Sequence, residues 1–315
     1  MGQADWLRLQ WRMHRWEGTF VIGGAVLLSA AMAIVAWQLD ASRDLVVACY
    51  EQPTQTLSAE CRSAIEWGNT LAGAIGILGA VATVTPFAAG IVLGAPLLSR
   101  EIEHRTAPMA WTLSPSRRSW LAWRTVPLLI VLIVALLVLG QASAFLLKTA
   151  EEGELGFRHY GMFGPMLAAR GLAVFGLGLV VGLALGRVLP AVLMTALASV
   201  LLVAGLSFGR DLMMRDEAVW RPMGDGSEVV SMVFDSGFES DETGEVITWE
   251  QAFNEYPEVF TEFGEGAPPG MSPVWKIVPP EQFDVYEARE IGALALTAVL
   301  LGALALLLVG RRRPE

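Results

Sequence analysis

Residues 100–124 read REIEHRTAPMAWTLSPSRRSWLAWR, a basic and aromatic stretch between two long apolar runs. It holds five arginines and only two glutamates, whereas the chain on either side is almost uncharged over the thickness of a membrane. Lys and Arg close to the ends of membrane spans are retained in the cytoplasm. We therefore expect a cytoplasmic loop, and its pattern predicts a short helix, a turn and a second helix that re-enters the membrane.

The composition indicates a membrane protein. A soluble domain is about a quarter charged, whereas this 315-residue chain is 17% charged and 54% hydrophobic. The apolar residues gather in runs of about 20, the length that a helix needs to cross the hydrocarbon core. We therefore predict an all-α, polytopic membrane protein with six transmembrane helices, at about 19–38, 70–98, 126–147, 166–186, 188–208 and 290–310.

These runs divide the chain into four parts. They are an amphipathic cytoplasmic helix at 1–18, five spans with a basic cytoplasmic loop at 19–208, and a small extracytoplasmic domain at 209–288, followed by the sixth span with a basic cytoplasmic tail at 289–315. The loop itself is at 99–125. Scattered aromatic residues supply the extracytoplasmic domain with only a modest core. Such a small core is marginal alone, so we expect the domain to lie against membrane-proximal loops or a second copy.

The N-terminal segment has the spacing of an amphipathic helix that lies in the membrane interface and contacts lipids. Its expected anchors are tryptophans on one side and arginines on the other: Trp6, Trp16, Arg8, Arg12 and Arg15. A generic positively charged leader is the alternative.

The charge distribution predicts the orientation. With the N-terminus inside and six crossings, 12 of the 22 Lys and Arg residues but only 5 of the 32 acids lie on the cytoplasmic side. Both basic termini and both basic turns agree with this orientation. We therefore expect a multi-pass protein of the plasma membrane with both termini in the cytoplasm.

Cys49 and Cys61 are the only cysteines, and both fall on the outer side, where disulfides persist. Only one intrachain pairing exists. We expect a disulfide across the loop at 39–68, with two free buried thiols as the alternative.

Several kinds of chemistry are not encoded by recognisable motifs. The chain has no G-x-x-x-x-G-K-[ST] phosphate loop, so it is not expected to bind ATP in that way. It shows no metal-ligand spacing, and we expect no nucleic-acid partner. The spans are nearly free of charge, and Arg170, near the start of the fourth span, is expected to snorkel outward. A proton-driven carrier or voltage sensor is therefore disfavoured.

Three motifs carry a resemblance. The loop contains Glu101, Glu103, His104 and Thr106, then Ala110-Trp111-Thr112, then Ser116-Arg117 ahead of Trp120. This pattern resembles the cytoplasmic coupling segment of type-2 ABC transporter permeases of the actinobacterial kind. GRVLPAV at 186–192 and PPEQFDVYEAREIG at 279–292 are similar to two further motifs of that family. The sequence departs at Arg105, where the family often has glycine, and in the length of 209–288.

The resemblance implies a permease subunit without catalytic residues or a cofactor of its own. Two copies, identical or not, would work with separate ABC ATPase subunits that bind ATP and magnesium, and would export a lipophilic drug, antibiotic, peptide or lipid. The expected ATPase-coupling residues are Glu101, Glu103, His104, Thr106, Trp111 and Arg117. Of the two acids, one is expected to pair within the loop and the other to face the partner.

Other functions stay open. The same fold could serve a non-transporting membrane sensor or immunity protein, and an intramembrane enzyme is disfavoured by the missing catalytic groups. The charged loop could also be a topological anchor only.

Overall fold

The computed structural model describes residues 3–50, 58–112, 116–151, 155–223, 231–260 and 267–311, with side chains described from residue 16 onward. Within these residues the chain divides into two compact units. The first unit, which we call the helical unit, comprises Met1–Gly153, Gly161–Val203 and Arg289–Glu315. The second, the sheet unit, comprises Glu154–Tyr160 and Ala204–Ala288.

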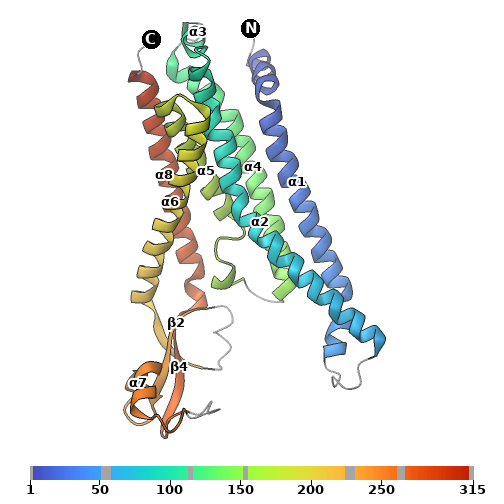
Figure 1. Ribbon diagram of the computed structural model, residues 1–315, viewed down its shortest axis with the longest axis vertical. Coiled ribbons are helices and arrows are strands. Elements are labelled where there is room, and N and C mark those ends of the chain that lie inside the picture. The colour runs from blue at the N-terminus through green and yellow to red at the C-terminus, as the bar shows by residue number, and fades with distance from the viewer. Residues whose placement is uncertain are drawn as a thin grey trace. The chain divides into compact units, whose positions relative to one another are not determined.

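Six helices in the described residues are long and apolar enough to cross a membrane, which confirms the predicted all-α class with six spans. They are α1 Gln3–Tyr50, α2 Ala59–Glu103, α4 Arg117–Glu151, α5 Pro165–Leu185, α6 Val188–Glu217 and α8 Phe283–Arg311 (Figure 1). Gly186, at φ 62°, ends α5, and α6 begins two residues later. The fourth and fifth spans therefore form the tight hairpin that their sequence spacing indicates.

The first helix differs from its expected bounds. A separate helix within 1–18 was expected before a span at 19–38, but α1 runs without a break from Gln3 to Tyr50. No proline lies between these two segments, and Gly18 is accommodated within the helix. Because an uninterrupted helix keeps all its internal backbone bonds, the two expected elements form one.

The helical unit is organised around α5, the most buried of the six long helices. Its largest interface is with α2, and glycines bring the two backbones together. A Cβ atom on Gly94 would lie 2.6 Å from the carbonyl oxygen of Phe175, and one on Gly178 would lie 2.7 Å from the nitrogen of Ala95. Small residues at helix–helix contacts are typical of membrane bundles, so α2 and α5 are expected to move as a pair.

The remaining long helices expose much of their apolar surface. Exposed hydrophobic side chains cover α1, α6 and α8, including Phe20, Leu27, Trp37, Leu193, Leu201, Phe208, Leu296, Val299 and Leu307. A soluble protein rarely shows contiguous apolar surface of this extent. These faces are therefore suited to contact with lipid tails.

The sheet unit contains a small antiparallel sheet that the sequence pattern did not reveal. Its strands are β1 Val219–Pro222, β2 Met232–Ser240, β3 Val246–Thr248 and β4 Met271–Val278, in the order β1-β4-β2-β3. Trp220 pairs with Lys276, and Phe238 pairs with Ile247. A short helix, α7 Trp249–Glu255, follows β3 directly.

Aromatic contacts hold residues 155–160 within the sheet unit. Phe157 and Tyr160 pack against Phe283 and Tyr286, at the start of α8. The Tyr160 hydroxyl donates to the Tyr286 carbonyl at 3.0 Å, and the Tyr286 hydroxyl donates to Glu217 at 2.6 Å. The sheet unit thus includes a segment that lies outside the expected 209–288 domain.

Candidate functional site

The end of α2 opens the segment that the sequence predicts to be the coupling element. His104 caps the helix, and Arg105 follows with φ 57°, the one positive φ among the described non-glycine residues. The Thr106 N–H donates to the Glu101 carbonyl at 3.0 Å, and the Arg105 N–H donates to the Ile102 carbonyl at 3.1 Å. This pattern is a Schellman motif, whose left-handed residue is usually glycine. Arg105 therefore holds a backbone conformation that glycine adopts without strain, at the position where the resemblance leads us to expect glycine.

The expected short helix is α3, Ala107–Thr112. Ala107 is buried, whereas Met109 is 70% exposed, so α3 rests on the helical unit by one side and presents Met109 on the other. The Ser116 hydroxyl then accepts a hydrogen bond from the Ser119 N–H at 3.1 Å and caps α4. Residues 113–115 lie outside the described residues. Both expected helices of the loop are therefore present, and the expected turn between them falls on these undescribed residues.

The first predicted coupling acid is engaged inside the chain. Glu101, on α2, forms an ion pair with Arg124, on α4, and the two side chains are only 13% and 12% exposed. Removing one member of such a pair leaves the other charge desolvated and alone, which costs about 3–5 kcal/mol when the pair is buried. The pair therefore ties the end of α2 to the start of the third span.

Aromatic rings extend this connection to α3. The Arg124 guanidinium lies 5.6 Å from the ring centroid of Trp120, and Trp120 meets Trp111 edge-on at 5.9 Å. Arg117 lies 4.8 Å from the Trp111 ring. Cation–π contacts of this kind contribute roughly 0.5–1 kcal/mol at exposed sites and more where desolvated. A continuous series of contacts thus runs from Glu101 to α3.

The second predicted acid reaches a different helix. A carboxylate oxygen of Glu103 accepts a hydrogen bond from the Val188 N–H at 2.8 Å, at the first residue of α6. Negative charge is favourable at a helix N-terminus, typically by about 0.3–1 kcal/mol. Glu101 therefore pairs within the loop at 99–125, as was expected of one acid, whereas Glu103 bonds to α6 and is exposed. The contact of an acid with a partner stays a prediction.

A pocket lies beside these contacts, between α1, α2 and α4. Its volume is about 240 Å³, and its wall is apolar apart from two ion pairs. The pair not yet described joins Arg100 and Glu17 at 3.0 Å. Drug-sized ligands occupy sites of roughly 300–1,000 Å³. The pocket is thus too small to hold such a ligand without movement of the helices.

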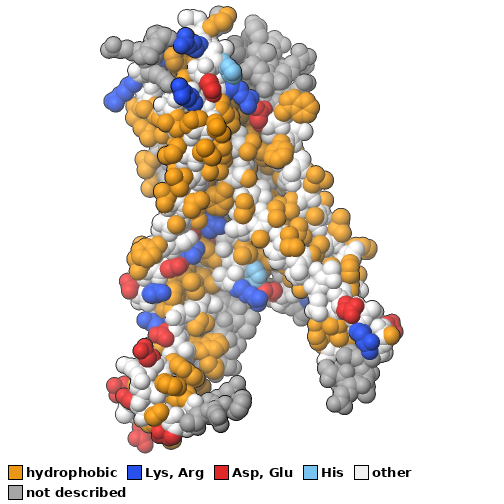
Figure 2. All heavy atoms as spheres, viewed as in Figure 1, with side chains coloured by type: hydrophobic (Ala, Val, Ile, Leu, Met, Phe, Trp, Pro, Cys, Tyr) orange, Lys and Arg blue, Asp and Glu red, His pale blue; other side chains and the backbone are white. Residues whose placement is uncertain are grey.

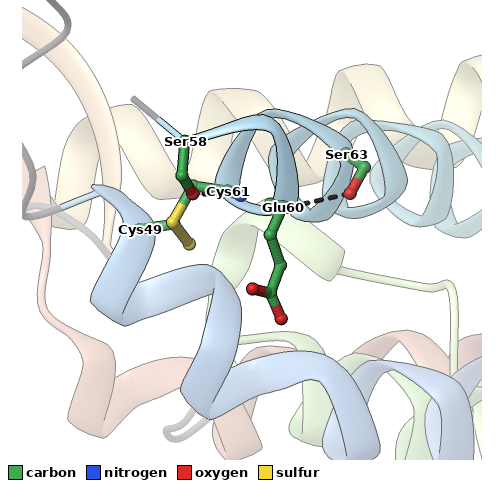
Figure 3. The surroundings of a disulfide bond; sticks show 5 residues. All are labelled: Cys49, Ser58, Glu60, Cys61 and Ser63. Carbon is green, nitrogen blue, oxygen red and sulfur yellow. Dashed lines mark hydrogen bonds between the residues drawn. A yellow bond between two sulfur atoms is a disulfide. The ribbon is translucent and has the colours of Figure 1, made fainter. Parts of the chain in front are cut away.

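The predicted disulfide is present. Cys49, near the end of α1, is bonded to Cys61, in the first turn of α2, and both residues are buried (Figure 3). The Ser58 hydroxyl caps α2 by accepting from the Cys61 N–H at 3.1 Å. The disulfide therefore links the first two long helices at one end of the helical unit.

The predicted interface anchors are only partly described. Trp16 is exposed on α1. The side chains of Trp6, Arg8, Arg12 and Arg15 lie outside the described residues. Their role at the membrane surface stays a prediction.

One buried ion pair was not predicted from the sequence. Arg170 was expected to snorkel outward, but its guanidinium lies 3.0 Å from a carboxylate oxygen of Glu290, and the side chains are only 7% and 8% exposed. Arg170 also donates to the Gly161 carbonyl at 2.9 Å. The signal in the sequence was a pair of opposite charges near the ends of two spans, since such residues pair inside membrane proteins.

Comparison with known proteins identifies the bundle. A family model described as ABC-2 membrane transporter related matches residues 22–209, which include all of α2, α4 and α5, most of α1 and α6, and the loop between α2 and α4. No curated protein and no solved structure matches the chain.

Proposed function

This chain belongs to the ABC-2 membrane transporter related family, and on that premise we propose that it is the permease subunit of an ATP-driven exporter. A multi-pass membrane protein of this family is a transport-related membrane subunit. The finer proposal is that two copies operate with separate ABC ATPase subunits, which bind ATP and magnesium, and move a lipophilic molecule across the plasma membrane.

The observation that carries the proposal is the pair of acids at the end of α2. Glu101 contacts α4 through Arg124, and Glu103 contacts the start of α6 through Val188. A partner that displaces the loop would therefore act on three long helices at once. Since α2 also packs closely against α5, the displacement would reach a fourth.

We assign the partner contact to α3. Its exposed Met109 and the neighbouring exposed His104 and Arg105 form the part of the loop that is open to an ATPase groove. Trp111 and Arg117 contact each other and join α3 to α4. In this division of roles α3 receives the motion, and the two acids transmit it.

The orientation is part of the same proposal. Basic residues gather in the loop at 99–125, at the start of α1 and at the end of α8. This distribution favours a cytoplasmic location for both termini. Cysteines introduced as Glu242→Cys and Arg118→Cys occupy exposed positions. An impermeant thiol reagent applied to intact cells should label the first and spare the second; the reverse would overturn the orientation.

The test of the function is purification with a candidate ATPase encoded beside this chain, followed by ATP hydrolysis measured in nanodiscs with lipophilic drugs and peptides. A stable complex whose hydrolysis responds to a compound, and whose expression lowers accumulation of that compound in cells, supports the exporter. A complex that binds the compound without any change in accumulation would indicate a sensor instead.

A further inference from the structure

An exposed aromatic face lies on the sheet unit, and nothing in the proposed transport cycle uses it. It consists of Trp249 and Phe253 on α7, which are 46% and 52% exposed, together with Phe260. The ring centroids of Trp249 and Phe260 are 5.1 Å apart, and those of Phe253 and Phe260 are 5.9 Å apart. We name these three residues the aromatic face.

The aromatic face is held firmly in place. Trp249 stacks on the buried Phe238 of β2, with centroids 5.3 Å apart. Thr248 and Gln251 form a capping box that fixes the start of α7, and Ala252 on the same helix is buried. Rings that are already ordered lose little conformational entropy when a ligand covers them. A ligand that covered these rings would therefore lose little of its binding free energy to ordering them.

The stretch of sequence that contains this face carries charge of one sign only. Between Arg221 and Lys276 the sequence contains twelve Asp and Glu residues and no Lys, Arg or His, although the whole chain has a net charge of only −10. Exposed acids lie close to the rings in the sequence: Glu250 and Glu255 are on α7, and Glu258 is two residues before Phe260. Figure 2 shows acidic side chains, in red, among hydrophobic ones, in orange, over this part of the sheet unit.

The aromatic rings and the acids together indicate which kind of ligand would bind this face. Aromatic rings bind apolar side chains, and their faces also attract Lys and Arg. Acidic surroundings raise the local concentration of cations and repel anions. A second copy of this unit would carry the same negative charge and be repelled, as would an anionic lipid surface. A ligand that is both apolar and strongly cationic satisfies both features.

We propose that the aromatic face is a docking site for cationic amphipathic peptides, which makes such peptides the cargo class of the exporter. This inference rests on the proposed function and on the proposed outer location of the sheet unit. In it, apolar side chains of the peptide cover Trp249 and Phe253, while its Lys and Arg residues lie over the neighbouring acids. The surface then collects the peptide on the outer side.

The test measures binding of a fluorescent leucine–lysine peptide with amphipathic helical spacing to the full chain in phosphatidylcholine nanodiscs, using empty nanodiscs as the blank. We expect saturable binding that weakens as salt is raised. The double substitution Trp249→Ala and Phe253→Ala should weaken it roughly tenfold, and Trp249→Phe should retain most of it. The triple substitution of Glu250, Glu255 and Glu258 to Gln should weaken binding and reduce its salt dependence.

Two controls test whether binding depends on this face and on the charge of the peptide. Val233→Ala removes a different exposed apolar side chain from the sheet unit and should leave binding unchanged. A peptide with glutamate in place of lysine should not bind. The proposal is overturned if the cationic peptide binds no better than to empty nanodiscs, if the anionic peptide binds equally well, or if the double substitution alters only the oligomeric state.

Because peptide binding requires no ATPase, the binding test can succeed or fail separately from the test of the exporter. A chain that binds the peptide but supports no transport would contradict the exporter and keep the docking site. A chain that exports other compounds but does not bind the peptide would contradict the docking site and keep the exporter.

Discussion

A carboxylate oxygen of Glu103 lies 2.8 Å from the backbone nitrogen of Val188, from which it is separated by 85 residues. The contact joins the end of α2 to the start of α6, two helices with no direct connection in the chain. Two residues earlier, Glu101 pairs with Arg124 of α4. The loop is therefore attached to the bundle at two points, and in the coupling that we propose these two contacts would pass the motion of a partner to the spans.

The first prediction concerns the exposed surface of α3. Met109→Glu places a charge on the side chain assigned to the ATPase groove, and should weaken association with the ATPase by roughly tenfold, as expected for a central interface residue. Met109→Leu preserves the apolar contact and should associate normally. Co-purification of the two subunits measures the effect. Equal recovery of the ATPase with the wild type and both variants would exclude Met109 from the interface.

The second prediction concerns the pair between Glu101 and Arg124. Glu101→Arg places a second positive charge beside Arg124. It should lower the thermal stability of the purified protein, because breaking a buried pair costs about 3–5 kcal/mol. The exchange Glu101→Arg with Arg124→Glu restores opposite charges and should recover much of this loss. Unfolding midpoints of the wild type, both single variants and the double variant form the cycle. Additive effects would show that the two residues do not interact.

A third prediction follows from the pair between Arg170 and Glu290. Arg170→Met leaves a buried carboxylate without its guanidinium and should destabilise the protein by about 3–5 kcal/mol. The combined change Arg170→Met with Glu290→Leu removes both charges and should be less harmful than the single change. Thermal unfolding in nanodiscs gives the comparison. If Arg170→Met unfolds like the wild type, the pair is not buried as the structure indicates.

The fourth prediction concerns the disulfide between Cys49 and Cys61, which are 12 residues apart. Replacing both by serine should lower stability by about 2–4 kcal/mol, the usual effect of opening a loop closed by a disulfide. Reducing the wild type should lower its unfolding midpoint similarly and leave the serine variant unaffected. Mass spectrometry after alkylation of the denatured, non-reduced protein provides a direct check, since two added alkyl groups would show free thiols.

The spans and the loop were predictable because each produces a strong local signal. Long apolar runs identify the helices, and the alternation of acids and bases around Glu101 marks the loop. The contact partners of its acids were not predictable. Glu101 meets Arg124, and Glu103 meets Val188, only once the chain is folded. Arg170 was misjudged for the same reason, because its partner Glu290 lies on a helix far along the chain.

The sheet unit was the least predictable part. β1 and β3 have only four and three residues, and along the nine-residue β2 apolar and polar residues alternate poorly. Pro273 lies within β4 and is a residue that argues against a strand from sequence alone. The aromatic residues of this region indicated a core, but not that Trp249 and Phe253 would remain exposed. Only tertiary contacts decide which rings are covered.

The central claim is that motion of the ATPase reaches α6 through Glu103. An environment-sensitive fluorophore can be attached to a cysteine at the exposed position of Leu193 on α6 or of Ile130 on α4. The fluorescence change on trapping ATP is then measured in the complex with the ATPase, for the wild type and for Glu103→Lys, with ATPase recovery as the control. We predict that both probes respond in the wild type, and that in Glu103→Lys the α4 probe still responds while the α6 probe is silent. An equal response of the α6 probe in both proteins, or no response of either probe in the wild type, would contradict this coupling route.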